Sequence, residues 1–168
     1  KSFRSVTAEK VRELVKELSP EIQPVGVFVN ASMELVTGLL NDGTLAAAQL
    51  HGQEDETYIR ELKQLSDKPI IKAFSVKTAE DIEKAVQSPA DYILLDQGSG
   101  GTGKTFDWSL IPEIERPFFL AGGIGALNMK QAIYEIRPYA VDLSSSVETE
   151  KWKDPKKIRQ VVDIVRRI

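Results

Sequence analysis

Two aspartates at the ends of apolar segments are the residues best placed to move protons. Asp96 closes the run Ile93-Leu94-Leu95, and Asp142 lies near the end of the last predicted strand, 140–143. A carboxyl group held there beside a loop that excludes water is partly desolvated, which raises its pKa toward the range of a general acid. We therefore predict Asp96 as a general acid, with a helix N-cap or a loop anchor as the structural alternative; Asp142 is open to the same two interpretations.

Glycines and serines follow the last two apolar segments and could bind a phosphate. Gly122-Gly123 and Ser144-Ser145-Ser146 each precede a helix or a helical turn. Backbone N–H groups at such a helix start bind anions, and glycine lets the backbone approach the anion closely. These five residues are predicted to cradle a phosphate, although a glycine pair also suits an ordinary tight turn.

A second glycine-rich stretch, Gly98-Ser99-Gly100-Gly101-Thr102-Gly103-Lys104-Thr105, matches the P-loop pattern of nucleotide hydrolases. A P-loop opens directly into a long helix, whereas Pro112 allows at most two helical turns after this stretch. The preferred interpretation is a glycine loop that covers an active site. A P-loop hydrolase remains an alternative.

The remaining candidates are single residues. His51 is the only histidine and precedes Gly52, a setting more typical of a hydrogen-bonded structural group than of a catalyst. Arg4 could contact a carboxylate through two hydrogen bonds, although by itself it resembles an ordinary surface arginine. Cysteine is absent, and no other residues have the spacing of metal ligands, so we predict neither a disulfide nor a metal site.

Composition narrows the class of protein. The chain has 168 residues, of which 42% are hydrophobic, and this fits one globular domain. Twenty-two basic against twenty-five acidic residues give a net charge of −3, which argues against a nucleic-acid or membrane partner. No apolar run approaches the ~20 residues of a membrane span, and the start lacks a signal peptide's apolar stretch. A cytoplasmic location is therefore expected.

Strands and helices alternate along the chain and must position these residues. Strands start near residues 24, 46, 70, 92, 118 and 140, with one helix in each interval except for a weak one near Trp108. Such alternation predicts a parallel sheet, either doubly wound or a barrel of eight units. In both folds the site lies at the carboxyl ends of the strands. The predicted strands are 24–30, 46–50, 70–74, 92–96, 118–121 and 140–143, and the predicted helices are 7–18, 32–41, 55–64, 78–87, 128–136 and 155–168. The polar residues at the predicted strand ends are Asn30, His51, Ser75, Asp96, Gly122 and Ser144.

Several motifs together resemble the phosphoribosylanthranilate isomerase family of tryptophan biosynthesis. The most specific are the runs from Gly103 to Trp108 and from Arg137 to Glu148. The other motifs are Lys1-Ser2-Phe3-Arg4, Val25-Gly26-Val27-Phe28-Val29-Asn30, Gln49-Leu50-His51-Gly52, Leu94-Leu95-Asp96 and Ala121-Gly122-Gly123.

This resemblance implies a TIM (β/α)8 barrel that catalyses an Amadori rearrangement of a sugar phosphate without a cofactor. It makes Asp96 the general acid and places the general base on a cysteine at the end of the first strand. It makes Arg4 the ligand of the anthranilate carboxylate, with His51 and Asp142 also binding substrate. Gly122, Gly123, Ser144, Ser145 and Ser146 correspond to the phosphate cradle.

Two departures from the family pattern produce further expectations. The first strand with its cysteine, the first helix and the second strand are missing, so six of eight strands are expected and the chain should have little isomerase activity. Such a chain could self-associate through its exposed sheet edges, or act as an inactive assembly or binding module. The other departure is Ser146, where relatives usually carry glycine. A positive φ there would cost serine about 1 kcal/mol.

Overall fold

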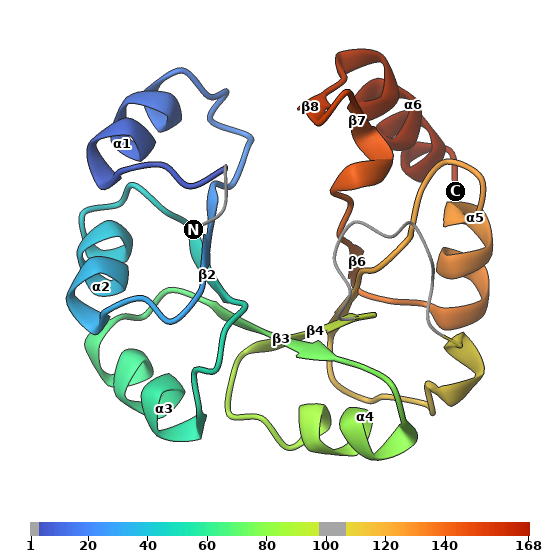
Figure 1. Cartoon of the computed structure of the whole chain (residues 1–168), viewed down its shortest axis with the longest axis horizontal. Helices are drawn as coiled ribbons and strands as arrows, with labels where there is room; N and C mark the ends of the chain where they lie inside the picture. The colour runs from blue at the N-terminus through green and yellow to red at the C-terminus, as the bar shows by residue number, and fades with distance from the viewer. Residues whose placement is uncertain (1–3, 98–106) are drawn as a thin grey trace. The chain divides into compact units, whose positions relative to one another are not determined.

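A computed structural model describes residues 4–97 and 107–168 (Figure 1). Its six parallel strands follow one another in the order β1-β2-β3-β4-β5-β6, which confirms the predicted α/β class and number of strands. The chain divides into two compact units, Lys1–Lys72 with Pro89–Asp91 and Ala73–Ser88 with Tyr92–Ile168. The single domain expected from the sequence stays a prediction.

The first unit is built from helices that start at polar caps. Thr7, Ser32 and Asp55 each accept a hydrogen bond from a backbone N–H of the first helical turn, which satisfies a donor that the helix leaves open. The elements are α1 (Ala8–Lys16), β1 (Val25–Phe28), α2 (Met33–Asn41), β2 (Ala47–Leu50), α3 (Glu56–Leu65) and β3 (Ile70–Ser75), whose last three residues belong to the second unit.

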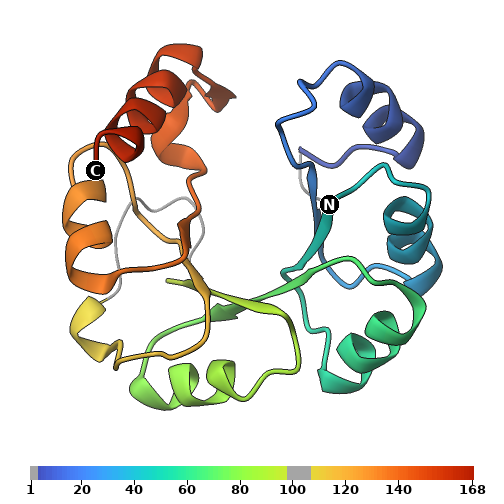
Figure 2. The same ribbon diagram turned by 180° about the vertical axis from the view of Figure 1, so that it is seen from behind.

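Helices α1, α2 and α3 lie along one face of these strands (Figures 1 and 2). Alternate strand residues point to opposite faces, so Phe28 and Leu50 pack into the helix layer, while His51 is directed to the other face. On that other face Val27 and Val29 are 61% and 64% exposed. The core of this layer contains Val36, Leu39, Leu40, Ala48, Ile59, Leu62 and Ile70.

The second unit repeats the same layering around β4 and β5. Strand residues that face the helices, among them Ile93, Leu95, Phe118 and Leu120, pack against Met129 and other buried helix residues. The elements are α4 (Ala79–Val86), β4 (Tyr92–Asp96), the 3-10 helix η1 (Trp108–Leu110), β5 (Phe118–Leu120), α5 (Met129–Gln131), the π-helix η2 (Ala132–Ile136), β6 (Ala140–Val141), the 3-10 helix η3 (Ser145–Val147) and α6 (Pro155–Arg166).

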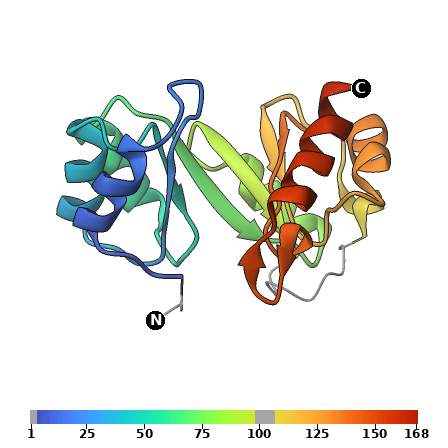
Figure 3. The same cartoon turned by 90° about the horizontal axis from the view of Figure 1, so that it is seen from above.

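The second unit also contains features that the sequence did not predict. An antiparallel hairpin of β7 (Glu148–Thr149) and β8 (Trp152–Lys153) precedes α6 (Figure 3). Its turn residues Glu150 and Lys151 have φ of 52° and 70°, values that favour glycine. The sequence of this turn therefore lacks the glycine that usually indicates such a turn. No helix among the described residues is long and apolar enough to cross a membrane.

Candidate active site

Asp96 is held at the carboxyl end of β4 by its neighbours on both sides. Its carbonyl oxygen accepts a hydrogen bond of 2.7 Å from the Val76 N–H, which follows β3. On the β5 side, the Ala121 N–H donates to the Leu95 carbonyl at 2.9 Å. The side chain of Leu95 is fully buried, whereas Asp96 is half-buried. β4 therefore places the Asp96 carboxylate at the end of the sheet, where the side chain is partly accessible to solvent.

The glycine turn after β5 approaches this carboxylate closely. Gly122 has a φ of +80°, and a Cβ atom added to it would lie 2.8 Å from both Asp96 Oδ1 and the Gln97 backbone nitrogen. Real Cβ atoms are not found so close to other heavy atoms. This position therefore requires glycine for two reasons, its positive φ and the lack of space for a side chain. The structure brings Asp96 and Gly122 together, and their roles in one site stay a prediction.

Asn128 fixes the rest of this turn, a role that the sequence did not reveal. Its Oδ1 accepts from the Gly125 N–H at 2.9 Å, and its Nδ2 donates to the Gly123 carbonyl at 3.1 Å. Both bonds close the segment Gly123–Gly125 into a compact loop before α5. Asparagine is a common residue at helix starts, so its position at the first residue of the predicted helix was the available signal.

The serine turn after β6 packs against this loop. A Cβ atom added at Gly125 would lie 3.0 Å from Ser146 Cβ. Ser146 is not among the non-glycine residues with positive φ in the described chain, so it fits without backbone strain. Its Oγ is buried and has no hydrogen-bond partner among the described residues. Ser144 is held through its carbonyl oxygen, which accepts from Lys153 Nζ at 2.9 Å.

Asp142 follows β6 on the same side of the unit. Its N–H donates to the Leu120 carbonyl at 2.9 Å, next to the turn that contains Gly122. The second unit therefore gathers Asp96, Asp142 and the two predicted phosphate turns at the carboxyl ends of β4, β5 and β6. Arg4 and His51 belong to the first unit, where Arg4 is exposed.

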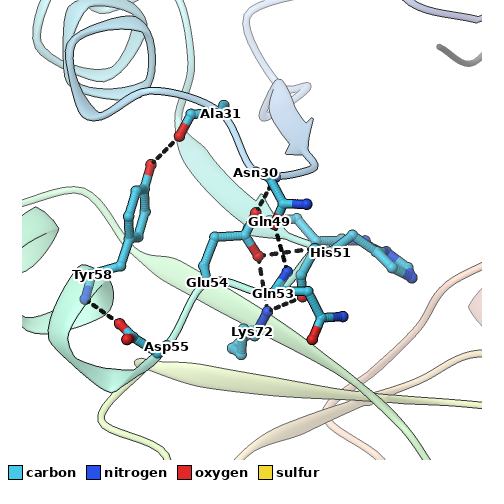
Figure 4. A network of polar contacts seen from close by, with 10 residues as sticks. Asn30, Ala31, Gln49, His51, Gln53, Glu54, Asp55, Tyr58 and Lys72 are labelled. Carbon is cyan, nitrogen blue, oxygen red and sulfur yellow. Dashed lines mark hydrogen bonds and ion pairs between the residues drawn. The ribbon is translucent and has the colours of Figure 1, made fainter.

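His51 directly follows β2, is exposed, and has contacts through its backbone and its ring. Its N–H donates to the Phe28 carbonyl at 2.8 Å, and its Nδ1 lies 3.3 Å from the Gln49 Nε2. In Figure 4 the imidazole points away from the Glu54 carboxylate. Gln49 is buried, so the amide that contacts the imidazole is itself held in place.

A buried ion pair beside His51 was also missed by the sequence reasoning. Lys72 Nζ lies 2.9 Å from Glu54 Oε2, and the two side chains are 7% and 1% exposed (Figure 4). Burial alone raises the pKa of Glu54, but hydrogen bonds from Lys72 and from backbone N–H groups outweigh it and lower that pKa. The available signal was Lys72 itself, because a lysine inside an apolar strand requires a buried partner.

Two predictions on metal and nucleotide binding concern side-chain clusters and the glycine-rich stretch after β4. The part of the chain that is described has no cluster of three or more metal-ligating side chains. The whole P-loop-like stretch, residues 98–105, lies outside the described residues. The described segment that follows it begins with the three-residue helix η1, not with the long helix of a P-loop protein.

The family model and the relatives that match this chain agree on one protein family. Residues 1–164 match the family described as N-(5'phosphoribosyl)anthranilate (PRA) isomerase. A relative from Endomicrobium trichonymphae, named N-(5'-phosphoribosyl)anthranilate isomerase, is 45% identical over 164 residues, which are 95% of this chain and 79% of the relative. The chain belongs to the PRA isomerase family.

Solved structures of PRA isomerases agree with this assignment. The crystal structure of the Thermotoga maritima enzyme matches with a TM-score of 0.86 and 36% identity, over all of this chain and 84% of that one. A PRA isomerase in complex with reduced 1-(o-carboxyphenylamino)-1-deoxyribulose 5-phosphate matches with a TM-score of 0.84 and 34% identity, over 100% and 84% of the two chains. The predicted TIM-barrel family is thereby confirmed, and neither alternative function gains support.

Proposed function

We propose that the protein is a phosphoribosylanthranilate isomerase of tryptophan biosynthesis. The reaction converts N-(5-phosphoribosyl)anthranilate into 1-(2-carboxyphenylamino)-1-deoxyribulose 5-phosphate. Membership of the PRA isomerase family supports this proposal, as does the likeness to a PRA isomerase in complex with a reduced form of that product. A sugar phosphate is the small molecule that the site takes.

Asp96 is the proposed general acid. It donates its proton to the furanose ring oxygen of the substrate, and the ring opens to a Schiff base. A base then removes the proton from C2, which gives an enolamine that becomes the ketone product. The family places that base on a cysteine, and the 168 residues contain none. The expectation that these residues alone turn over little substrate stays a prediction.

Binding of the substrate is divided among the other predicted residues. Gly122, Gly123 and the serine turn hold the phosphate through backbone N–H groups. Arg4 binds the anthranilate carboxylate by a charge-assisted contact, and His51 and Asp142 contact the rest of the substrate. These assignments follow the family resemblance residue by residue. The cytoplasm is the compartment that we propose for this reaction.

The observation that carries the proposal is the close approach of Gly122 to Asp96. The predicted acid and the predicted phosphate turn lie on different strands, yet a Cβ atom added to Gly122 would lie only 2.8 Å from Asp96 Oδ1. A sugar phosphate bound here would contact the phosphate turn through its phosphate group and Asp96 through its sugar ring. Such positioning of substrate against an acid is a major source of catalysis.

Turnover of the anthranilate substrate tests the proposal. The substrate is fluorescent, and its fluorescence falls as it is converted. We expect the full-length protein to accelerate this loss, and Asp142→Asn to slow it. A protein that binds the reduced product analogue but gives no turnover would instead support the inactive binding module.

A further inference from the structure

The buried pair of Glu54 and Lys72 has no role in the proposed reaction, yet it holds the residue next to His51. Gly52 donates its N–H to Glu54 Oε2 at 2.8 Å and accepts from Lys72 Nζ at 2.8 Å through its carbonyl oxygen. Both polar groups of one residue are therefore bound by the two members of one ion pair. The two peptide groups on either side of Gly52, the first of which joins it to His51, are therefore each held by one bond.

The same carboxylate also fixes the loop after β1. Glu54 Oε1 accepts from the Asn30 N–H at 2.6 Å, and the Asn30 Oδ1 accepts from the Gln53 N–H at 2.7 Å (Figure 4). Asn30 has a φ of 50°, a left-handed conformation that costs a non-glycine residue energy. The loops after β1 and β2 are thus tied together, and this tie holds a strained residue in place.

The two loops are also in direct contact at Gly52. A Cβ atom added there would lie 2.5 Å from Asn30 Oδ1 and 2.7 Å from the Asn30 backbone nitrogen. The backbone after His51 therefore packs against Asn30 with no space for movement in that direction. Bonds from the ion pair and contact with Asn30 restrict the same short segment.

A purely stabilising role would not need this arrangement. A buried ion pair gains little stability over apolar residues of the same size, because both charges lose their hydration. This pair directs its bonds to the backbone around His51, at the strand ends where the substrate residues lie. We propose that Glu54 and Lys72 are positioning residues, which fix the direction of the His51 imidazole toward the substrate. This inference rests on the proposed function, because it takes His51 to contact the substrate.

Lys63 provides a matched control. Like Lys72, its Nζ contacts one carboxylate and one backbone carbonyl, those of Asp91 and Pro89. Pro89 and Asp91 precede β4, so this contact is at the opposite ends of the strands from His51. Lys63→Met therefore removes the same kinds of bond without disturbing the segment next to His51.

A double-mutant cycle in the full-length protein tests the inference. The dissociation constant of reduced 1-(o-carboxyphenylamino)-1-deoxyribulose 5-phosphate is measured by calorimetry for Lys72→Met, His51→Ala and the double variant. We expect each single change to weaken binding about 10-fold, and the double variant to bind no more weakly than His51→Ala, since coupled residues are not additive. Lys63→Met should bind as tightly as the unchanged protein.

Other results would contradict the inference or the proposed function, and the two failures are distinguishable. If the losses from Lys72→Met and His51→Ala multiply in the double variant, or if Lys72→Met binds normally, the ion pair does not act through His51. If His51→Ala itself binds normally, the proposed role of His51 fails instead. Glu54→Gln, which keeps the side-chain shape, replaces Lys72→Met in the cycle if that variant does not fold.

The imidazole signals of His51 give a readout that does not depend on binding. His51 is the only histidine among the 168 residues, so its ring resonances can be assigned by substitution. Glu54→Gln should shift and broaden them, because the ring then samples several directions, and Lys63→Met should leave them in place. Unchanged resonances in Glu54→Gln would contradict a positioning role.

Discussion

Gly122→Ala should be more damaging than an alanine at another glycine with the same backbone conformation. Gly122 and Gly43 have φ of +80° and +78°, so alanine at either position costs about 1–2 kcal/mol of conformational energy. A Cβ atom at Gly43 would meet nothing within 4 Å, whereas at Gly122 it would meet Asp96 Oδ1 and the Gln97 nitrogen at 2.8 Å. Moving those groups should add about 1–3 kcal/mol, as overpacking does.

Urea denaturation of the two variants measures this difference. We expect Gly122→Ala to lower the free energy of unfolding by about 1–3 kcal/mol more than Gly43→Ala does. Because the added methyl group displaces the Asp96 carboxylate, kcat should also fall in Gly122→Ala and stay unchanged in Gly43→Ala. Equal losses of stability in the two variants, or a normal kcat in Gly122→Ala, would refute the close packing of Gly122 against Asp96.

Three further predictions follow from the charges and exposed residues of the first unit. The folded chain lowers the pKa of Glu54 below its ordinary value of 4.5, so its contribution to stability is present above that pH and is lost as the pH falls through the folded pKa. The stability difference between the unchanged protein and Glu54→Gln, measured by denaturation against pH, should therefore shrink below pH 4.5; a constant difference would contradict it. Arg4→Ala should chiefly raise KM, since it removes ground-state binding of a carboxylate, and an unchanged KM would make Arg4 an ordinary surface charge. Val27 is 61% exposed on β1, whose only strand neighbour among the described residues is β2. Val27→Lys should therefore reduce self-association, as measured by sedimentation velocity. An unchanged protein that sediments as a single monomeric species would contradict this prediction.

The helices and strands could be predicted because their signals are local. Thr7, Ser32 and Asp55 were expected at the starts of helices, and each caps one in the structure. The apolar runs of the strands alternate with these helices, which is enough to predict a parallel sheet. Irregular elements depend on packing instead. The predicted helix 128–136 begins as α5 and continues as the π-helix η2, which is followed by Arg137 with a φ of 52°; no residue there signals this change in the sequence.

The candidate site was predictable by residue type and less so by contact. Asp96 and Gly122 could be chosen because one ends an apolar strand and the other comes just after one, but their mutual approach depends on the register between β4 and β5. The partner of Lys72 was not identified because Glu54 lies 18 residues earlier, in a loop whose course depends on the strained Asn30. Long-range polar contacts of this kind are decided by the three-dimensional arrangement of the loops.

Turnover by Asp96→Asn tests the central proposal most directly. Asparagine keeps the shape of the side chain but cannot donate a carboxylic proton to the ring oxygen. In the full-length protein we expect kcat to fall by about 10²-fold or more, with binding of the reduced product analogue nearly unchanged. A kcat close to that of the unchanged protein would contradict the assignment of Asp96 as the general acid.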